Sequence, residues 1–438
     1  MALVEVVVAV TKKTKNTNSL AALTIATLAL PGISPTAIAA EAEYFDLDSQ
    51  FTRYSESNNR MKIDVYQANA SIPFNDKFKL KINGVKDVIT GASPIYYKPT
   101  NGQAKMQKSG ASIKDVRDAV DISGNYIHSA GNVGLNVGRS SENDYDSTFF
   151  NIDSLLDFNQ KRTSLSSGYG YSSDNVWAVD HCPSDYIYKG SQCASIPILT
   201  FPPGLIPQTF INNGMYRRPD VGGEKQTHQG LLGLTQILNK DALIQTNLTY
   251  THNQGYLSDP YKDAYLEGAT PLCFHNDCGT YVHDTRPTNR DQFATLVRYV
   301  QHFGALNAAA MHVDYRFYAD TWGVDAHTFE FTWIQPIYAG WNLTPRMRYY
   351  SQGAADFYAP YFLSTRADGF YSSDYRLANF GAIGGGVQLN KEFFNRLNLG
   401  LGIDFYERKM NYGINGGAGT AEDNFSFSMF SAKINFKY

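Results

Sequence analysis

Charged side chains recur at every second position in three successive segments between residues 306 and 352. They are His312, Asp314 and Arg316 in the first segment, Glu330 in the second, and Arg346 and Arg348 in the third. If the segments are neighbouring β-strands about 4.8 Å apart, these groups form an arginine–carboxylate ladder. Opposed charges of this kind can select ions inside a pore. They can also simply balance charge inside a narrow barrel, which is the interpretation we favour.

All four cysteines fall in two long stretches without strand periodicity. They are Cys182, Cys193, Cys273 and Cys278. Disulfides form in oxidising compartments, so for an exported chain we expect each cysteine to bridge the other cysteine of its own stretch. Other pairings stay open. A metal site is the alternative, because His181, His275 and His283 lie nearby in the sequence.

A third group of polar and aromatic side chains lies where the same segments end. The candidates for a binding rim are Asp320, Trp322, Asp356, Tyr358, Arg366, Asp368, Asp374 and Arg376. Such a rim can bind a sugar, a polymer or a partner protein, or it can fold into the mouth as a plug. Hydrolysis would need a general base such as His327 within hydrogen-bonding reach of its proton. The sequence has neither a G-x-S-x-G elbow nor an H-E-x-x-H motif, so we expect no enzyme.

Cofactor and metal signals are equally sparse. Asp356, Asp368 and Asp374 are acidic, but their spacing does not match a calcium-binding loop. There is no glycine-rich phosphate loop between a strand and a helix, and the Gly384–Gly386 run falls within a predicted strand, where it indicates a kink or bulge. We therefore expect no cofactor and no resident metal.

The elements that position these groups show a period of two. From Leu397 to Phe405, apolar side chains at odd positions alternate with Asn398, Gly400, Gly402 and Asp404. The segment that ends the chain at Tyr438 alternates in the same way. Such alternation gives each strand one apolar and one polar face. Because the polar faces carry charges and glycines, we expect the apolar faces to contact lipid and the polar faces to line a lumen.

Sixteen such segments are predicted, and their connections are asymmetric. The segments are 42–56, 60–72, 76–89, 113–127, 131–141, 144–157, 160–172, 226–238, 242–255, 288–302, 306–319, 324–337, 341–352, 374–391, 396–409 and 424–438. Every even-numbered connection is short, and the odd-numbered ones include all the long loops. That asymmetry is typical of a bacterial antiparallel barrel, with periplasmic turns on one side and extracellular loops on the other.

The N-terminus resembles an export signal. Lysines at 12, 13 and 15 precede a short apolar stretch, and an A-x-A cleavage pattern ends at Ala39. We expect a signal peptide over 1–39 and a barrel over 40–438. The whole chain has a formal charge of −3 and the first 39 residues carry +2, so the mature part carries −5. This acidic balance argues against nucleic acid as a partner.

Several long strings resemble one bacterial family. They include Ser109–Ser112, Ser141–Tyr145, Gly255–Lys262, His312–Gly323, Arg348–Phe362, Arg366–Gly369 and Tyr371–Leu377. Together they resemble the outer-membrane proteins called domain of unknown function 3570, from about residue 60 to the end. The resemblance implies an outer-membrane barrel and no known substrate or catalytic residue. The cysteine-bearing insertions at 173–225 and 263–283 depart from it.

These observations predict a protein of the bacterial outer membrane. A porin-like channel for ions or small solutes is the leading hypothesis, because sixteen strands leave room for an aqueous lumen. The alternative is a non-conducting scaffold that docks an envelope protein, and a hydrolytic enzyme at the rim is a more distant one. The expected partners are outer-membrane lipid, lipopolysaccharide and the barrel insertion machinery.

Overall fold

The structure is a computed structural model, and it describes most of the chain. The described residues are 45–91, 94–101, 103–108, 113–181, 210–211, 215–267, 279–414, 416 and 420–438. The predicted signal peptide and the four cysteines lie outside them. Within the described residues the chain is all-β, with a few single turns of 3-10 helix and no α-helix. No helix in that part of the chain is long and apolar enough to cross a membrane.

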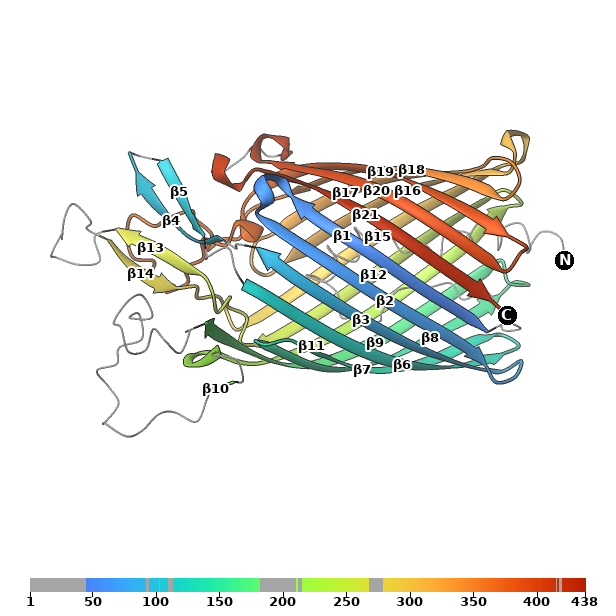
Figure 1. Ribbon diagram of the computed structural model, residues 1–438, viewed down its shortest axis with the longest axis horizontal. Helices are drawn as coiled ribbons and strands as arrows, with labels where there is room; N and C mark the ends of the chain where they lie inside the picture. Colours follow the sequence, from blue (N-terminus) through green and yellow to red (C-terminus); the bar gives the residue numbers. More distant parts are fainter. Residues whose placement is uncertain are drawn as a thin grey trace.

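Sixteen antiparallel strands form one closed barrel (Figure 1), which confirms the predicted fold class. They are β1 (Asp46–Glu56), β2 (Met61–Pro73), β3 (Phe78–Gly91), β6 (Ile113–His128), β7 (Gly131–Ser141), β8 (Tyr145–Phe158), β9 (Thr163–His181), β11 (Met215–Asn239), β12 (Ala242–Gly255), β15 (Asn289–Phe303), β16 (Ala309–Asp320), β17 (Asp325–Pro336), β18 (Trp341–Gln352), β19 (Phe380–Phe393), β20 (Leu397–Lys409) and β21 (Phe425–Lys437). The last strand pairs with the first over its whole length, which leaves no open edge.

The two faces of the wall separate apolar from polar side chains. On β20, Leu399, Leu401 and Phe405 are exposed on the outside, whereas Asp404 and Arg408 between them are buried on the inside. The same alternation runs through the other strands, because successive side chains of a strand point to opposite faces. The outer wall therefore offers an apolar band to lipid, and most of the inner wall is polar.

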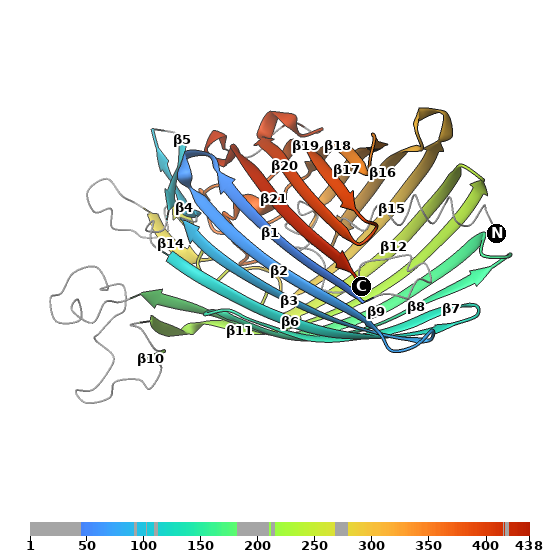
Figure 2. The same ribbon diagram turned by 45° about the vertical axis from the view of Figure 1, so that its right-hand side comes forward.

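The two ends of the barrel differ as the connection lengths predicted. Short turns join the strands at the end where the C-terminus lies, and the long connections emerge at the other end (Figures 1 and 2). Two of the long connections form hairpins that the sequence analysis did not predict. They are β4 (Pro94–Thr100) with β5 (Gln103–Lys108), and β13 (Asp263–Glu267) with β14 (Gly279–His283). Both project beyond the barrel end.

Strand ends at the long-loop side differ from the predicted ones. Strand β9 continues past residue 172, and strand β11 begins before residue 226. The two strands stay paired in this region, where Ser173–Val179 lie opposite Arg217–Gln226 across an irregularity at Arg218/Gly222. The two-residue strand β10 (Phe210–Ile211) pairs only with β11. Strand β19 begins at Phe380 rather than at 374, because a 3-10 turn, η4 (Tyr375–Leu377), precedes it. Asp374 caps that turn by accepting from the Arg376 N–H at 3.0 Å.

The long connections pack together into a cap over part of the barrel mouth. We call residues 256–267, 279–288 and 353–379 the loop cap. Two buried apolar clusters hold it together; one comprises Trp322, Val324, Ala355, Phe357 and Leu377, and the other comprises Ala264, Leu266, Phe362 and Tyr371. Tyr318, an inward-facing residue of β16, packs against the first cluster. The cap therefore rests on the inner wall of the barrel as well as on its rim.

Candidate functional site

The predicted charge ladder lies on the inner wall, and strand register aligns it. Asp314 on β16 is directly opposite Glu330 on β17, which is opposite Arg348 on β18. The row begins one strand earlier than predicted, because Arg298 on β15 faces Asp314 and donates from Nε to its Oδ1 at 2.8 Å. Arg298 was missed because its segment also carries apolar residues on the inner face, which obscured the alternation.

Arg346 has a partner two strands away. Its Nε donates to Asp404 Oδ1 on β20 at 2.8 Å, and its Nη2 lies 2.5 Å from the other carboxylate oxygen. The strand between them, β19, carries Gly386 opposite both residues. A Cβ at Gly386 would lie 1.8 Å from Asp404 Oδ1, so only glycine leaves room for the bridge. The predicted bulge at the glycine run is instead a regular strand that lacks side chains where the bridge crosses it.

Arg316 differs from the other ladder residues. It is exposed to the interior of the barrel, and among the described residues it has no hydrogen bond and no ion pair. The charges of two arginines and two carboxylates lie within electrostatic range of it, those of Arg348, Asp314, Arg298 and Glu330. His312, two residues before Asp314 on the same face, is buried, and its Nε2 has no hydrogen-bond partner in the described part of the chain.

The opposite wall has a different chemistry. There, on β6 to β8, Asn136 donates to Asp121 Oδ2 at 2.8 Å and to Ser123 Oγ at 2.7 Å, and Asn151 donates to Asn136 at 3.1 Å. The hydrogen-bonding side chains here are short, and the wall also carries the carboxylates of Asp121 and Asp153. Arginines therefore concentrate on the β15–β18 wall, where Arg298, Arg316, Arg346 and Arg348 face the carboxylates of Asp314, Glu330 and Asp404. The four arginines of this wall outnumber the three carboxylates by one positive charge.

A second charged group lies inside the loop cap. Asp374 is fully buried and contacts Arg286 at 2.9 Å, Arg376 at 2.6 Å and Lys262 at 3.9 Å. Burial alone would raise the pKa of Asp374, but the positive charges of Arg376, Lys262 and Arg286 lower it well below its ordinary value. Arg376 also pairs with Asp259, so this network ties Asp259, Lys262 and Arg286 to residues 374–376.

The predicted rim residues divide into buried and exposed members. Trp322 lies in the apolar cluster of the cap, and Asp320 is held by Arg290 at 2.9 Å and by Tyr318 at 2.6 Å. Asp356 and Asp368 are exposed, and Asp368 pairs with Arg366 at 2.6 Å.

The remaining rim residues lie in different places. Tyr358 donates to Asp423 at 3.4 Å within the cap. His327 lies 3.9 Å from Asp325 on the outer face of β17. Asp320 is on the inner face of β16. The described structure therefore does not gather Asp320, Asp325 and His327 into one group, and a binding role for the rim stays a prediction.

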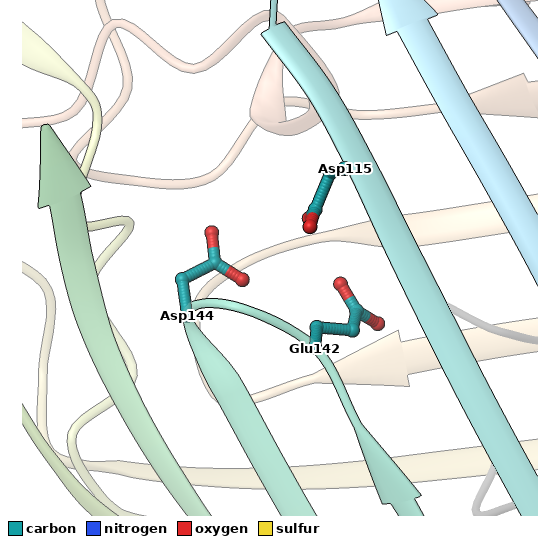
Figure 3. A group of neighbouring side chains, drawn as sticks. All are labelled: Asp115, Glu142 and Asp144. Atoms are coloured by element: carbon teal, nitrogen blue, oxygen red, sulfur yellow. The ribbon is translucent and has the colours of Figure 1, made fainter. Parts of the chain in front are cut away.

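Three carboxyl groups missed by the sequence analysis meet at the end of β6 and in the β7–β8 connection (Figure 3). Asp115, Glu142 and Asp144 each place one oxygen within 4.8 Å of the others. Asn143 Nδ2 donates to Asp115 at 2.8 Å. Burial, reinforced by Asp144, raises the pKa of Glu142 to about 7, although Arg117 opposes the shift. Burial likewise raises the pKa of Asp144 to about 6.

The carboxyl cluster can share protons, and its oxygens are of the kind that hard cations prefer. It was missed because Asp115 lies about 30 residues from the other two in the sequence. Only the pairing of β6 with β7, which sets Asp118 opposite Ser141, brings them together.

The architecture and the polar inner wall define a transmembrane-type β-barrel, and comparison with known proteins places the chain in a family. Residues 20–429 match the family described as "Protein of unknown function (DUF3570)". The match covers most of the chain, so the protein belongs to this family, as its strings predicted. No curated protein matches the sequence.

Solved structures share the fold at low sequence identity. A bacterial polysaccharide outer membrane secretin is 6% identical, with a TM-score of 0.47, over 91% of this chain and 99% of its own. CdiB from Acinetobacter baumannii is 8% identical with the same TM-score of 0.47, over 90% of this chain and 60% of its own. The outer membrane protein OpdK from Pseudomonas aeruginosa is 10% identical, with a TM-score of 0.38, over 90% of this chain and 99% of its own. These likenesses concern the barrel fold.

Proposed function

We propose that this protein is an outer-membrane pore that favours small anions, and that Arg316 is the residue that sets this preference. The observation that carries the proposal is a guanidinium exposed to the lumen with no carboxylate partner among the described residues. An arginine stays protonated at every physiological pH. Because no ion pair in the described part of the chain holds this guanidinium, its charge raises the local concentration of anions.

The neighbouring arginines support this assignment by their pairing. Arg298 is neutralised by Asp314, and Arg346 by Asp404. Arg348 lies opposite Glu330 in the register. An anion that enters the lumen beside Arg316 meets a wall whose other charges are already largely balanced. On the opposite wall, Asn136 and Asn151 hydrogen-bond to each other, and Asn136 also bonds to Asp121, so short polar side chains line that side of the passage.

Conductance in a planar lipid bilayer tests the proposal. Purified wild-type protein should give stable ohmic steps, and a KCl gradient should give a reversal potential of the sign for chloride preference. Arg316→Ala should move that potential toward the value for a non-selective pore, and Arg316→Lys should restore it. Arg396→Ala is the matched control, because Arg396 is exposed in a short turn away from the lumen.

Either of two results would overturn the proposal. Folded protein that never conducts would exclude an open pore. A reversal potential that is the same for wild type and Arg316→Ala would remove Arg316 from ion selection. Because the four loop cysteines are predicted to form disulfides, the measurement is repeated under reducing conditions.

One observation favours the second candidate, a barrel that docks an envelope protein. Ordering long loops costs conformational entropy, yet the loop cap has two apolar clusters and a buried ionic network. A rigid cap of this kind offers a defined surface to a partner. In that case folded protein would stay silent in the bilayer, and removal of the cap would abolish partner binding.

The proposal also includes placement and orientation. The apolar outer band and the closed sheet suit a bilayer, and the asymmetry of the connections suits long loops outside the cell and short turns in the periplasm. We propose a transport or docking role rather than catalysis, since His327 and Asp325 lie on the outer face of β17 whereas Asp320 lies on the inner face of β16.

A further inference from the structure

The outer wall of the barrel contains a shallow hollow of about 520 Å³ between β1 and β7. Small-molecule sites span roughly 300–1,000 Å³, so the hollow is large enough for part of a ligand. Its floor is a row of small residues in direct register, with Ser49 opposite Ala68 and Ala68 opposite Gly84. Strand alternation places all three residues on the lipid-facing surface.

Aromatic and charged side chains border the hollow on the side of the long loops. The next row of the register sets Phe51 opposite Tyr66, and Tyr66 opposite Lys86. The rings of Phe51 and Tyr66 lie 5.2 Å apart. On the far side Arg139 lines the hollow, and Lys86 and Arg139 are exposed over 53% and 66% of their side chains.

The height of the hollow follows from strand geometry. Lys86 is eight residues after Phe78, which lies near the short-turn end and stacks on Tyr126 at 5.0 Å. A rise of about 3.3 Å per residue along strands tilted by about 40° places Lys86 roughly 20 Å above Phe78. The apolar band of such barrels is about 25 Å tall. The floor of the hollow therefore lies in the upper part of that band, and its cations lie near the boundary with water.

We propose that this hollow binds one acyl chain of an outer-leaflet lipopolysaccharide, whose phosphate contacts Lys86 and Arg139. The inference rests on the proposed outer-membrane placement and not on conductance. An acyl chain fills a lipid-facing depression lined by small residues, and a phosphate is the headgroup charge that exposed lysine and arginine attract.

The existing ion pairs leave room for that contact. Lys86 Nζ is 3.1 Å from Asp118, and Arg139 is 3.6 Å from Asp146, but all four side chains are largely or partly exposed. Exposed pairs of this kind are weak, so a phosphate competes with them. A second copy of the chain is less suited to the hollow, because partly exposed charged side chains border it, and charged residues are depleted from the core of a protein interface.

Native mass spectrometry of the folded, detergent-solubilised barrel tests the proposal with bisphosphorylated lipid A as the probe. The wild type should retain one lipid A. Gly84→Leu should fill the hollow and weaken retention about tenfold. The substitution is tolerated locally, because a Cβ at Gly84 meets no atom within 4 Å. Gly230→Leu is the matched control, because Gly230 also lies in open space on the lipid-facing wall, outside the hollow.

The charge is tested separately. Lys86→Gln with Arg139→Gln should reduce the preference for lipid A over dephosphorylated lipid A, while Gly84→Leu should weaken both lipids alike. Unchanged retention in Gly84→Leu would overturn the inference. So would equal effects of Gly84→Leu and Gly230→Leu, or a Gly84→Leu protein that loses a dimer or trimer present in the wild type. A barrel that retains lipid A but does not conduct would overturn only the pore.

Discussion

The loop cap and the lumen wall contain the same types of charged residue, but these residues have different roles. In the cap, Asp374 is fully buried among Arg286, Arg376 and Lys262, and of these three cations only Arg376 is partly exposed. In the lumen, Arg316 is exposed and has no acidic partner among the described residues. Burial decides the role, because a buried charge must be compensated inside the protein, whereas an exposed one is free to act on solutes.

The largest expected effect tests the cap side of this comparison. Asp374→Asn removes the carboxylate that Arg286, Arg376 and Lys262 share. Asp259 and Asp284 are then left to face three cations, so the cap should lose about 3–5 kcal/mol of stability. Native-state proteolysis of residues 256–288 and 353–379 measures the loss. Asp368→Asn is the control, because its pair with Arg366 is exposed, and it should change little. Equal protection of both variants would show that the ionic network does not hold the cap.

A pH effect at the carboxyl cluster sharpens the comparison, because Glu142 and Asp144 are half-buried and share one nearby cation, Arg117, among the described residues. Their folded-state pKa values, about 7 and about 6, lie above the ordinary values of 4.5 and 3.8. The folded state therefore binds more protons between about pH 4 and pH 7, and stability falls as the pH rises through that window. Each carboxyl contributes a slope of at most about 1.4 kcal/mol per pH unit.

Hydrogen exchange of the β7–β8 connection measures this slope. Its protection should decrease from pH 4 to pH 7 in the wild type, and Glu142→Gln should flatten the decrease. Glu422→Gln serves as the control, because Glu422 lies in an exposed pair with Lys105. Protection that rises with pH in the wild type would contradict the assigned direction.

The smallest expected effect is a change in ion preference, and it tests the lumen wall. Gly386→Ala should displace the Asp404 carboxylate and release Arg346 into the lumen, since the new Cβ would lie 1.8 Å from Asp404 Oδ1. The preference for anions should then increase modestly, opposite to the change in Arg316→Ala. Reversal potentials measure it, with Gly124→Ala as the control in open space. A decrease in anion preference would show that the Arg346–Asp404 bridge is not what neutralises Arg346.

The strand pattern predicted the barrel well because the alternation within each strand shows which of its side chains share a face. Period two fixed which side chains of β16, β17 and β18 point inward, so the ladder residues could be named in advance. Arg298 and Asp404 were missed as ladder members, although Asp404 was already assigned to a polar face. Their partners lie on other strands, and the Arg346–Asp404 bridge crosses a whole strand at Gly386.

The loops could not be predicted in the same way. Nothing local in the sequence indicates that Asp374 is fully buried while Asp368, six residues earlier, is exposed. Loop packing depends on contacts between segments about 100 residues apart, such as Leu266 with Phe362. The period of two in the sequence carries no information about such contacts.

By itself, the sequence determined the all-β class, the number of barrel strands, their inward faces and the family. Those features follow from a repeating, local constraint, since a strand between lipid and lumen must alternate apolar and polar residues. Only the tertiary structure decided which charges are neutralised and which are free. That outcome depends on register across strands and on how the cap folds over the mouth, and both are properties of residues far apart in the chain.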